Sequence, residues 1–332
     1  MREPIPLETE NGLYLPELEL FLDSRHPREN GFISHAHADH FGRHENILCS
    51  EPTAHILKAR YNVADERLNP QPFHEPLEVG PYRLQLLPAG HIYGSAMLHI
   101  TRKKDRESLL YTGDFKLHRG LTTENPVFRQ ADTLVMETTF GAPKWIFPGT
   151  NEITGMILNF VNQSLEEGAV PALLAYSLGK AQEIQAILAQ AGIPALSHPA
   201  VAKMTSACRE AGCQLPEPLI FDGSLPSGHA IICPPNVMRS EKFQAMTGLR
   251  TAILSGWALD KNAIYRFGVD AAFPLSDHAD FPGLLEAVRR VNPRRIITIH
   301  GYTREFAAEL RRQNYEAWAV DGGDQMELDL QR

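Results

Sequence analysis

The segment ISHAHADHFG, residues 33 to 42, places three histidines and one aspartate within six positions, directly after an apolar run typical of a β-strand. Side chains alternate along a strand with period two, so His35 and His37 point the same way, and the turn that follows brings Asp39 and His40 to a neighbouring point. Imidazole and carboxylate groups bind zinc and other first-row divalent ions, and this layout suits two adjacent ions. Ordinary surface or core histidines are the alternative, but three of them interleaved with an aspartate favour a metal site.

One loop cannot fill two coordination spheres, so further ligands are expected at the ends of other strands. Three candidates follow predicted strands: His91 in LPAGHIYGS, Asp114 in LLYTGDFK and His300 in RRIITIHGY. A carboxylate at the end of an apolar strand is costly to bury unless a cation pairs with it. Taken singly, each residue is as easily a satisfied core residue as a ligand. Together they complete a set for two metal ions.

The pattern of apolar and turn residues differs between two parts of the chain. From residue 12 to about 140, short strands such as LELFLDS, YRLQLLPAG, SLLYTGD and DTLVMETT are divided by turn residues, with one helix expected at EPTAHILKARY, which suggests stacked sheets. From Thr150 to about residue 260, apolar strands alternate with amphipathic helices such as KAQEIQAILAQAG, which predicts a parallel sheet covered by helices. The last stretch repeats this theme in FPGLLEAVRRVN, RRIITIHG and TREFAAELRRQN.

Composition limits the class of protein. With 332 residues, of which 43% are hydrophobic and 22% charged, the chain is long enough for two domains. No apolar run approaches the length needed to cross a bilayer, and the first residues lack a basic stretch before an apolar one, so we expect a cytoplasmic protein with no membrane partner. The four cysteines form no CxxC pair and are expected to be buried thiols. The net charge of −8 disfavours nucleic-acid binding over the whole surface, so local basic patches must provide it.

These segments resemble a known family. The HxHxDH loop, the histidine in a glycine-bounded turn and TGD are similar to the metallo-β-lactamase fold. The continuation METTFGAPKW, AYSLGKAQEI, LSDHADFPGL and TIHGYT resembles the β-CASP nucleases of that fold, and most closely the bacterial ligase-associated DNA exonucleases. The likeness runs from about Gly12 to Gly322. It implies an α/β protein, a metallo-β-lactamase αββα sandwich with an inserted β-CASP α/β domain whose parallel sheet is flanked by helices.

The resemblance also gives a domain map. Because His35 and His300 must both lie about 2 Å from metal, the chain between Asp114 and His278 has to leave the metal domain and return. Residues 1–148 are expected to form the first part of the metallo-β-lactamase domain, residues 149–265 the inserted β-CASP domain, and residues 266–332 the return segment. The substrate is expected to run between the insertion and the metal-bearing sheets.

Family positions imply the metal ligands. Two divalent ions are expected, zinc first and manganese as the alternative. The first ion would be held by His35, His37 and His91, and the second by Asp39, His40 and His300, with Asp114 bridging the two.

Family positions also imply the catalytic residues, which are Asp23, Asp39, Glu137 and His278. Asp23 in FLDSR would steady the ligand loop. Glu137 and His278 would form a pair beside the leaving group, with His278 as the general acid. A plainer interpretation of SDHAD is a helix cap, since it directly precedes the predicted helix FPGLLEAV.

The loop YSLGKAQE passes from a predicted strand into a helix. Its backbone amides at Gly179, together with Ser177 and Lys180, are candidates to bind a substrate phosphate. An ordinary strand–helix turn explains the same residues, because the loop lacks a second glycine.

Four functions remain open at this point. The first is a hydrolase that cuts phosphodiester bonds of DNA, an exodeoxyribonuclease acting on single strands or ends in repair beside a DNA ligase and other repair-operon proteins. The runner-up is an RNA-processing nuclease, because a histidine at the position of His300 is frequent in the RNA-cutting members of the resembling family. A small-molecule metallohydrolase would share the metal site but lack SLGKAQE and LSDHAD, and an inactive nucleic-acid-binding scaffold would have lost ligands that this chain retains.

Overall fold

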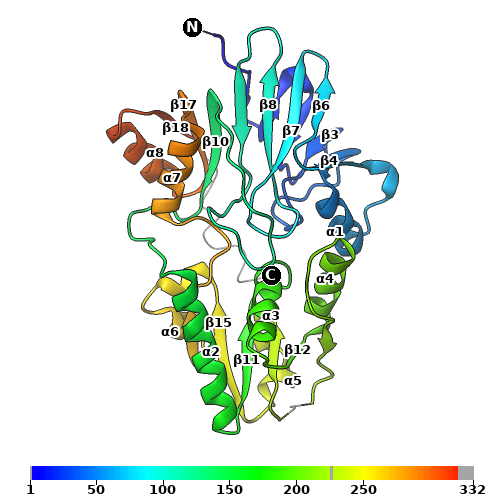
Figure 1. Ribbon diagram of the computed structural model, residues 1–332, viewed down its shortest axis with the longest axis vertical. Coiled ribbons are helices and arrows are strands. Elements are labelled where there is room, and N and C mark those ends of the chain that lie inside the picture. The colour runs from blue at the N-terminus through cyan, green and yellow to red at the C-terminus, as the bar shows by residue number, and fades with distance from the viewer. Residues whose placement is uncertain (1, 225–226, 321–332) are drawn as a thin grey trace. The chain divides into compact units, whose positions relative to one another are not determined.

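The computed structural model describes residues 2–224 and 227–320 of the chain (Figure 1). Contacts divide these residues into two compact units. Unit 1 runs up to Trp145 and resumes at His278, and unit 2 is Ile146–Asp277. The three-part division at 148 and 265 remains a proposal.

Unit 1 contains two β-sheets. The first has the strand order β1-β2-β3-β4-β5, with bounds Leu13–Leu15, Leu20–Leu22, Asn30–Phe32, Asn46–Ser50 and Leu68–Gln71. The second has the order β18-β17-β10-β9-β8-β7-β6. Its strands in chain order are β6 (Pro76–Val79), β7 (Tyr82–Pro88), β8 (Ala96–Arg102), β9 (Ser108–Tyr111), β10 (Thr133–Thr138), β17 (Arg295–Gly301) and β18 (Glu316–Ala319). Parallel pairing of β10 with β17 sets Glu137 opposite Ile299 and brings distant parts of the chain together.

Three helices cover these sheets: α1 (Glu51–Tyr61), α7 (Phe281–Val291) and α8 (Thr303–Arg312), with short 3-10 turns η1 (Pro16–Leu18) and η2 (Asp65–Arg67). Helix α1 begins where the Ser50 hydroxyl accepts a hydrogen bond from the Thr53 amide, and it ends at Asn62 in the left-handed conformation. Helix α7 begins at Asp280, whose carboxylate accepts from the Gly283 amide at 2.9 Å. Local capping therefore sets both helix starts.

Two apolar cores explain the layering of unit 1. One lies between the sheets and includes Leu22 and Phe32 from the first sheet and Leu98 from the second. The other joins the second sheet to α7 and α8 and includes Leu284 and Phe306. With α1 packed on β4 and β5, the order is helix, sheet, sheet, helix, which confirms the predicted αββα sandwich.

Unit 2 is built on one six-stranded sheet of order β13-β12-β14-β11-β15-β16, in which every pairing is parallel. The strands are β11 (Val170–Leu174), β12 (Ala195–Ser197), β13 (Leu219–Ile220), β14 (Ala230–Cys233), β15 (Leu249–Leu254) and β16 (Ala271–Phe273). The helices are α2 (Thr150–Glu166), α3 (Lys180–Gln190), α4 (Pro199–Glu210), α5 (Glu241–Gln244) and α6 (Ala263–Phe267), with 3-10 turns η3 (Pro235–Arg239) and η4 (Gly256–Leu259).

Apolar cores lie on both faces of this sheet, and β11 is buried along its whole length. A continuous apolar strand such as VPALL is typical of a parallel sheet with both faces covered. The predicted α/β domain with a parallel sheet flanked by helices is thus confirmed.

All four cysteines are buried and form no disulfide, as predicted. In the part of the chain that the structure describes, none of the helices combines the length and the apolar character needed to span a bilayer.

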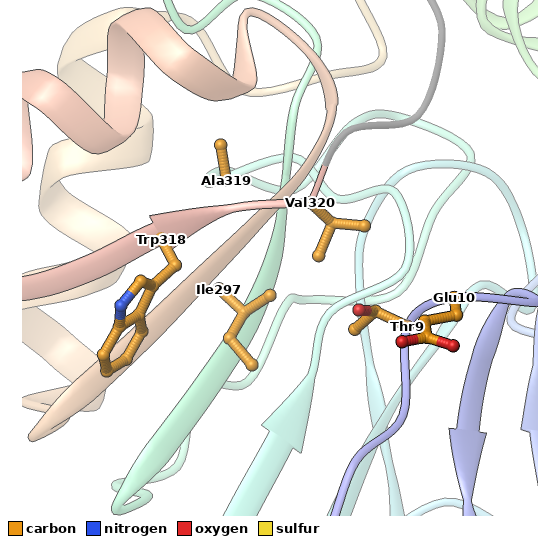
Figure 2. Close-up of a pocket in the computed structure, with 6 residues that line it drawn as sticks. All are labelled: Thr9, Glu10, Ile297, Trp318, Ala319 and Val320. Atoms are coloured by element: carbon orange, nitrogen blue, oxygen red, sulfur yellow. The ribbon is translucent and has the colours of Figure 1, made fainter.

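A cavity of about 390 Å³ lies in unit 1 at the edge of the second sheet (Figure 2). Side chains from the N-terminal segment and from β17 and β18 line it: Thr9, Glu10, Ile297, Trp318, Ala319 and Val320. None of these residues belongs to the predicted metal or catalytic set, so the cavity is separate from the candidate site.

Candidate metal and catalytic centre

The HxHxDH loop leaves the end of β3 and is fixed there by the main chain. The Ile33 amide donates to the Leu48 carbonyl at 2.9 Å, and the His40 amide donates to the His37 carbonyl at 3.3 Å. His35 and His40 are buried, whereas His37 is partly exposed. The loop therefore presents a ring of imidazoles at the strand end.

Three of the imidazoles predicted for the first metal face one another. His35 Nε2 lies 3.0 Å from His37 Nδ1, and His91 Nε2 lies 3.2 Å from the same atom. In a tetrahedral zinc site with Zn–N bonds of about 2.0 Å, neighbouring nitrogens lie about 3.3 Å apart. The donor set and its spacing therefore fit a zinc-sized ion held by His35, His37 and His91.

A second group shares His35 with the first. Potential ligand atoms of His35, His40 and Asp114 all lie within 4.8 Å of one another. Asp114 Oδ2 lies 3.1 Å from His40 Nε2, 3.7 Å from His35 Nε2 and 3.8 Å from His91 Nε2. One carboxylate oxygen thus borders both groups, which is the placement that a bridging ligand requires.

Electrostatics within the cluster favour the metal-binding forms of His35 and Asp114, whereas the carboxylates beside His40 favour its protonated form. Burial lowers the pKa of His35 well below its usual value, and the neighbouring His40, His91 and His37 lower it further, so His35 is neutral with a lone pair available. Burial opposes ionisation of Asp114, but His40 and then His278 outweigh it and hold the pKa of Asp114 well below its usual range. Burial also opposes a charge on His40, yet Asp114 and Asp39 raise its pKa well above the usual value.

Asp39 and His300 lie beside His40 but complete neither group. Asp39 Oδ2 is 3.6 Å from His40 Nε2, and the His300 ring centroid is 5.6 Å from that of His40. His300 has a backbone φ of +55°, in the left-handed region that is uncommon for residues other than glycine. Its carbonyl accepts from Thr138 Oγ1 at 2.6 Å. The metal-binding roles of Asp39 and His300 stay predictions.

Asp23 organises the ligand loop from behind. Its carboxylate accepts from the Ser34 amide at 2.7 Å, from Ser34 Oγ at 2.6 Å and from the Tyr111 hydroxyl at 2.7 Å. It also lies 2.8 Å from His40 Nδ1. With Nδ1–H donating to Asp23, His40 Nε2 is left to face Asp114, so Asp23 fixes which nitrogen serves as ligand.

Glu137 and His278 form the predicted pair. His278 Nδ1 lies 2.9 Å and 3.1 Å from the two Glu137 oxygens, and Glu137 is fully buried. The glutamate is oriented by the Phe115 amide at 2.9 Å and by Thr139 Oγ1 at 2.5 Å. Since ligand atoms of Asp114, Glu137 and His278 all lie within 4.8 Å, the pair borders the metal cluster.

Sequence reasoning missed several residues that position this centre. Glu124 accepts from the Gly94 amide with both oxygens, at 3.0 and 3.1 Å, and so holds the turn that carries His91. Arg60 donates to the Ala36 carbonyl at 2.9 Å, inside the HxH segment. Ser34 and Tyr111 stand next to the motif residues His35 and TGD, and that adjacency was the available signal. Glu124 and Arg60 gave no signal, because their partners are distant in sequence.

Polar groups of the loop predicted to bind phosphate form hydrogen bonds and an ion pair within unit 2. Gly179 has a φ of +96°, and its amide donates to Gln182 Oε1 at 2.7 Å. The buried Lys180 ammonium lies 2.5 Å from Asp277 Oδ1. The Ala181 amide donates to the Tyr176 carbonyl at 3.2 Å. Phosphate binding by Ser177, Gly179 and Lys180 therefore stays a prediction.

Comparison with known proteins gives independent findings. Residues 271–320 match the family described as "Zn-dependent metallo-hydrolase RNA specificity domain". A "Probable DNA ligase" of Opitutus terrae is 42% identical over 328 residues, which make up 98% of this chain and 32% of that protein. "Transcription termination factor FttA" of Methanothermobacter thermautotrophicus is 28% identical over 208 residues, 53% of this chain and 32% of the relative. "DNA cross-link repair 1A protein" of Mus musculus is 26% identical over 163 residues, 47% of this chain and 16% of the relative.

The chain spans about a third of the length of the first two of these relatives. Among solved structures, a protein of unknown function from Enterococcus faecalis V583 superposes with a TM-score of 0.60 at 14% identity, covering 88% of this chain and 79% of that one. At this identity the likeness concerns the fold alone.

Proposed function

Because this chain is a β-CASP protein of the metallo-β-lactamase fold, we propose that it is a two-metal nuclease that hydrolyses the phosphodiester bonds of DNA, acting on single-stranded ends. The observation that carries the proposal is one cluster in unit 1. There, two groups of metal-binding side chains share His35, and both border the Glu137–His278 pair.

The metal-binding residues have a defined part in this chemistry. His35, His37 and His91 would hold one ion, and His40 and Asp114 would hold the second with Asp39 and His300. Two bound divalent ions supply a lowered pKa for the attacking water and neutralise charge that develops on the phosphate. Asp23 keeps His40 in the ligating tautomer through its 2.8 Å contact with Nδ1.

His278 is the proposed proton donor. Its Nδ1–H is engaged by Glu137, so Nε2 is the nitrogen that delivers a proton to the departing 3′ oxygen. As the P–O3′ bond breaks, a bond forms between water oxygen and phosphorus, and the products carry a 5′-phosphate and a 3′-hydroxyl. Glu137 is buried and accepts hydrogen bonds from the Phe115 amide, the Thr139 amide and Thr139 Oγ1, so it keeps the imidazole in place through the reaction.

DNA is the favoured substrate because of the relatives. A protein named as a probable DNA ligase contains a segment 42% identical to nearly the whole of this chain, and a second relative is named for DNA cross-link repair. In the first relative the matched segment is 32% of the protein. A nuclease that trims DNA ends and a ligase that joins them act on the same ends. We therefore propose that a DNA ligase is the partner of this chain and that both act in the cytoplasm.

RNA processing is the second candidate. The matched family description names RNA specificity, and His300 stands at the position where RNA-cutting β-CASP proteins frequently carry histidine. That residue lies beside His40 at the metal cluster, so its identity bears directly on the site.

A matched digestion tests both candidates. Single-stranded DNA and RNA of one sequence, each with the 5′ or the 3′ end blocked, are incubated with protein loaded with zinc or manganese. We expect faster cleavage of DNA from an unblocked end, with 5′-phosphorylated products. A clear preference for RNA would replace the first proposal with the second, and cleavage of neither would refute both.

A further inference from the structure

The segment Thr139–Trp145, which directly follows β10, forms a fixed loop in unit 1. The Trp145 amide donates to the Ala142 carbonyl at 3.0 Å, and the Trp145 carbonyl accepts from the Phe281 amide at 3.0 Å. The Trp145 side chain is only 5% exposed. The loop is therefore anchored to the helix that follows His278.

Aromatic rings connect this loop to the catalytic pair. The Phe140 ring lies 6.0 Å from the His278 ring and 5.1 Å from the Trp145 ring, both edge-on. Tyr302, two residues after His300, completes the group with its ring 6.3 Å from Trp145. The Tyr302 amide donates to the Thr138 carbonyl at 2.9 Å. A chain of ring contacts therefore runs from His278 through Phe140 and Trp145 to Tyr302.

Lys144 places a cation over these two rings. Its ammonium lies 5.0 Å from the Trp145 ring centroid and 5.5 Å from that of Tyr302. The side chain is exposed, and within residues 2–224 and 227–320 no carboxylate lies in ion-pair contact with it. By contrast, Lys58, Lys103 and Lys180 are each paired with an acid. Among the described residues, Lys144 is therefore a positively charged side chain without a carboxylate partner.

We propose that Lys144, held by Trp145 and Tyr302, binds a backbone phosphate of the substrate strand. This phosphate neighbours the phosphodiester group that is cut. The inference rests on the proposed function and adds a substrate contact to it. A cation–π contact on two faces restricts the lysine stem before substrate arrives, so less side-chain freedom is lost on binding. Contact with a backbone phosphate carries no sequence information, which suits a nuclease that works through a strand regardless of its bases.

The test compares Lys144→Met with Lys144→Arg on single-stranded DNA. For Lys144→Met we expect KM to rise roughly fivefold and the slope of log binding constant against log salt to fall by about one, because one phosphate contact is lost. Lys144→Arg should retain most of the affinity. The loss should be larger for the oligonucleotide than for bis(p-nitrophenyl) phosphate, which has no neighbouring phosphate.

The matched control is Lys104→Met. Lys104 is also exposed in unit 1 but lies in the turn after β8, at the opposite end of that strand from His91. Removing this charge should alter neither KM nor the salt slope. If Lys144→Met matches wild type in both quantities, the ammonium has a purely structural role and the inference is wrong.

Binding separates this inference from the proposed nuclease function. Fluorescence anisotropy of a labelled oligothymidylate, measured with EDTA present so that no cleavage occurs, reports the contact directly. If wild type binds the strand but cuts neither substrate, the nuclease proposal fails, while weaker binding by Lys144→Met with a reduced salt slope still supports the phosphate contact. Equal binding by the two proteins would overturn it.

Discussion

Units 1 and 2 both bury ionisable side chains, but they satisfy them in different ways. In unit 2, the ammonium of Lys180 meets the carboxylate of Asp277 at 2.5 Å, with both side chains less than a tenth exposed. In unit 1, the imidazole nitrogens of His35, His37 and His91 face one another at 3.0 and 3.2 Å. The first arrangement pairs two opposite charges, whereas the second gathers electron-pair donors around a point that suits a cation.

This difference distinguishes structural burial from functional burial. Removing one partner of a buried opposite-charge pair leaves the other charge buried and uncompensated, so this change is expected to lower the stability of the fold. A buried group of electron-pair donors is suited to hold a metal ion. Substitution of one donor is therefore expected to change metal content and turnover. Each of the following changes tests that distinction.

The largest effect is expected for Asp114→Asn. The amide cannot supply the negative charge that borders both donor groups, so at least one ion should be lost and cleavage should fall by on the order of 10³-fold, equivalent to several kcal/mol of charge stabilisation. Elemental analysis and a single-strand DNA assay measure both. Asp65→Asn, which alters an exposed partner of Lys58, should change neither. Full metal content in Asp114→Asn would contradict the bridging role.

His278→Ala should separate metal binding from proton transfer. The variant should retain its metal and fold, while turnover falls by about 10²- to 10⁴-fold, because positioned acid catalysis contributes that much. The exposed His26 offers a matched control, and His26→Ala should behave as wild type. Undiminished cleavage by His278→Ala would show that the proton comes from another group.

Lys180→Met should affect stability above all. It leaves Asp277 buried without its cation, which is expected to cost about 3–5 kcal/mol of unfolding free energy. Urea denaturation followed by circular dichroism measures this, and Lys180→Met/Asp277→Leu should recover much of the loss. Lys203→Met removes an exposed lysine of the same unit and should be neutral. Normal stability combined with weaker DNA binding would instead make Lys180 a phosphate ligand and erase the contrast between the units.

A smaller, pH-dependent effect is expected at His99, a buried residue of β8 that lies outside the site. Burial, with a smaller contribution from Arg129, lowers the pKa of His99 to about 4. The unfolded chain therefore binds a proton more readily, so stability is intact above pH 6.5 and falls as pH drops from 6.5 towards 4, by up to about 3 kcal/mol.

His99→Gln should flatten this dependence. Its amide can still donate to the Gln130 carbonyl, which lies 3.1 Å from His99 Nε2, but it does not titrate. Urea unfolding of both proteins at pH 7 and pH 4.5 makes the comparison. Equal losses in the two proteins would assign the acid sensitivity to other groups.

Much of this arrangement could be predicted from sequence because the signals are local. Helix α1 occupies the segment EPTAHILKARY, since Ser50 caps it and Pro52 suits its first turn. The donors His35, His91 and Asp114 come together because each follows a strand of unit 1 at a sheet end. Hydrophobic patterning predicted stacked sheets and a parallel sheet covered by helices, and the family resemblance implied the αββα order.

The rest depended on contacts that have no local signal. Lys180 and Asp277 are 97 positions apart, so nothing near SLGKAQE indicated that its ammonium would be neutralised. The same holds for Glu124, which fixes the His91 turn from 30 positions away. Side-chain partners of this kind are decided by tertiary packing, and patterns of neighbouring residues do not encode them.

The position of β17 in the second sheet has a consequence for biosynthesis. This strand lies between β10 and β18, although more than 150 residues separate Thr138 from Arg295. β17 must therefore emerge from the ribosome before it can pair with β10 beside Glu137. His300, which lies on β17, reaches His40 only at that stage. Residues 146–277 have their own cores and can fold earlier. The proposed metal and catalytic centre is thus incomplete in a nascent chain until almost all of the described sequence has emerged.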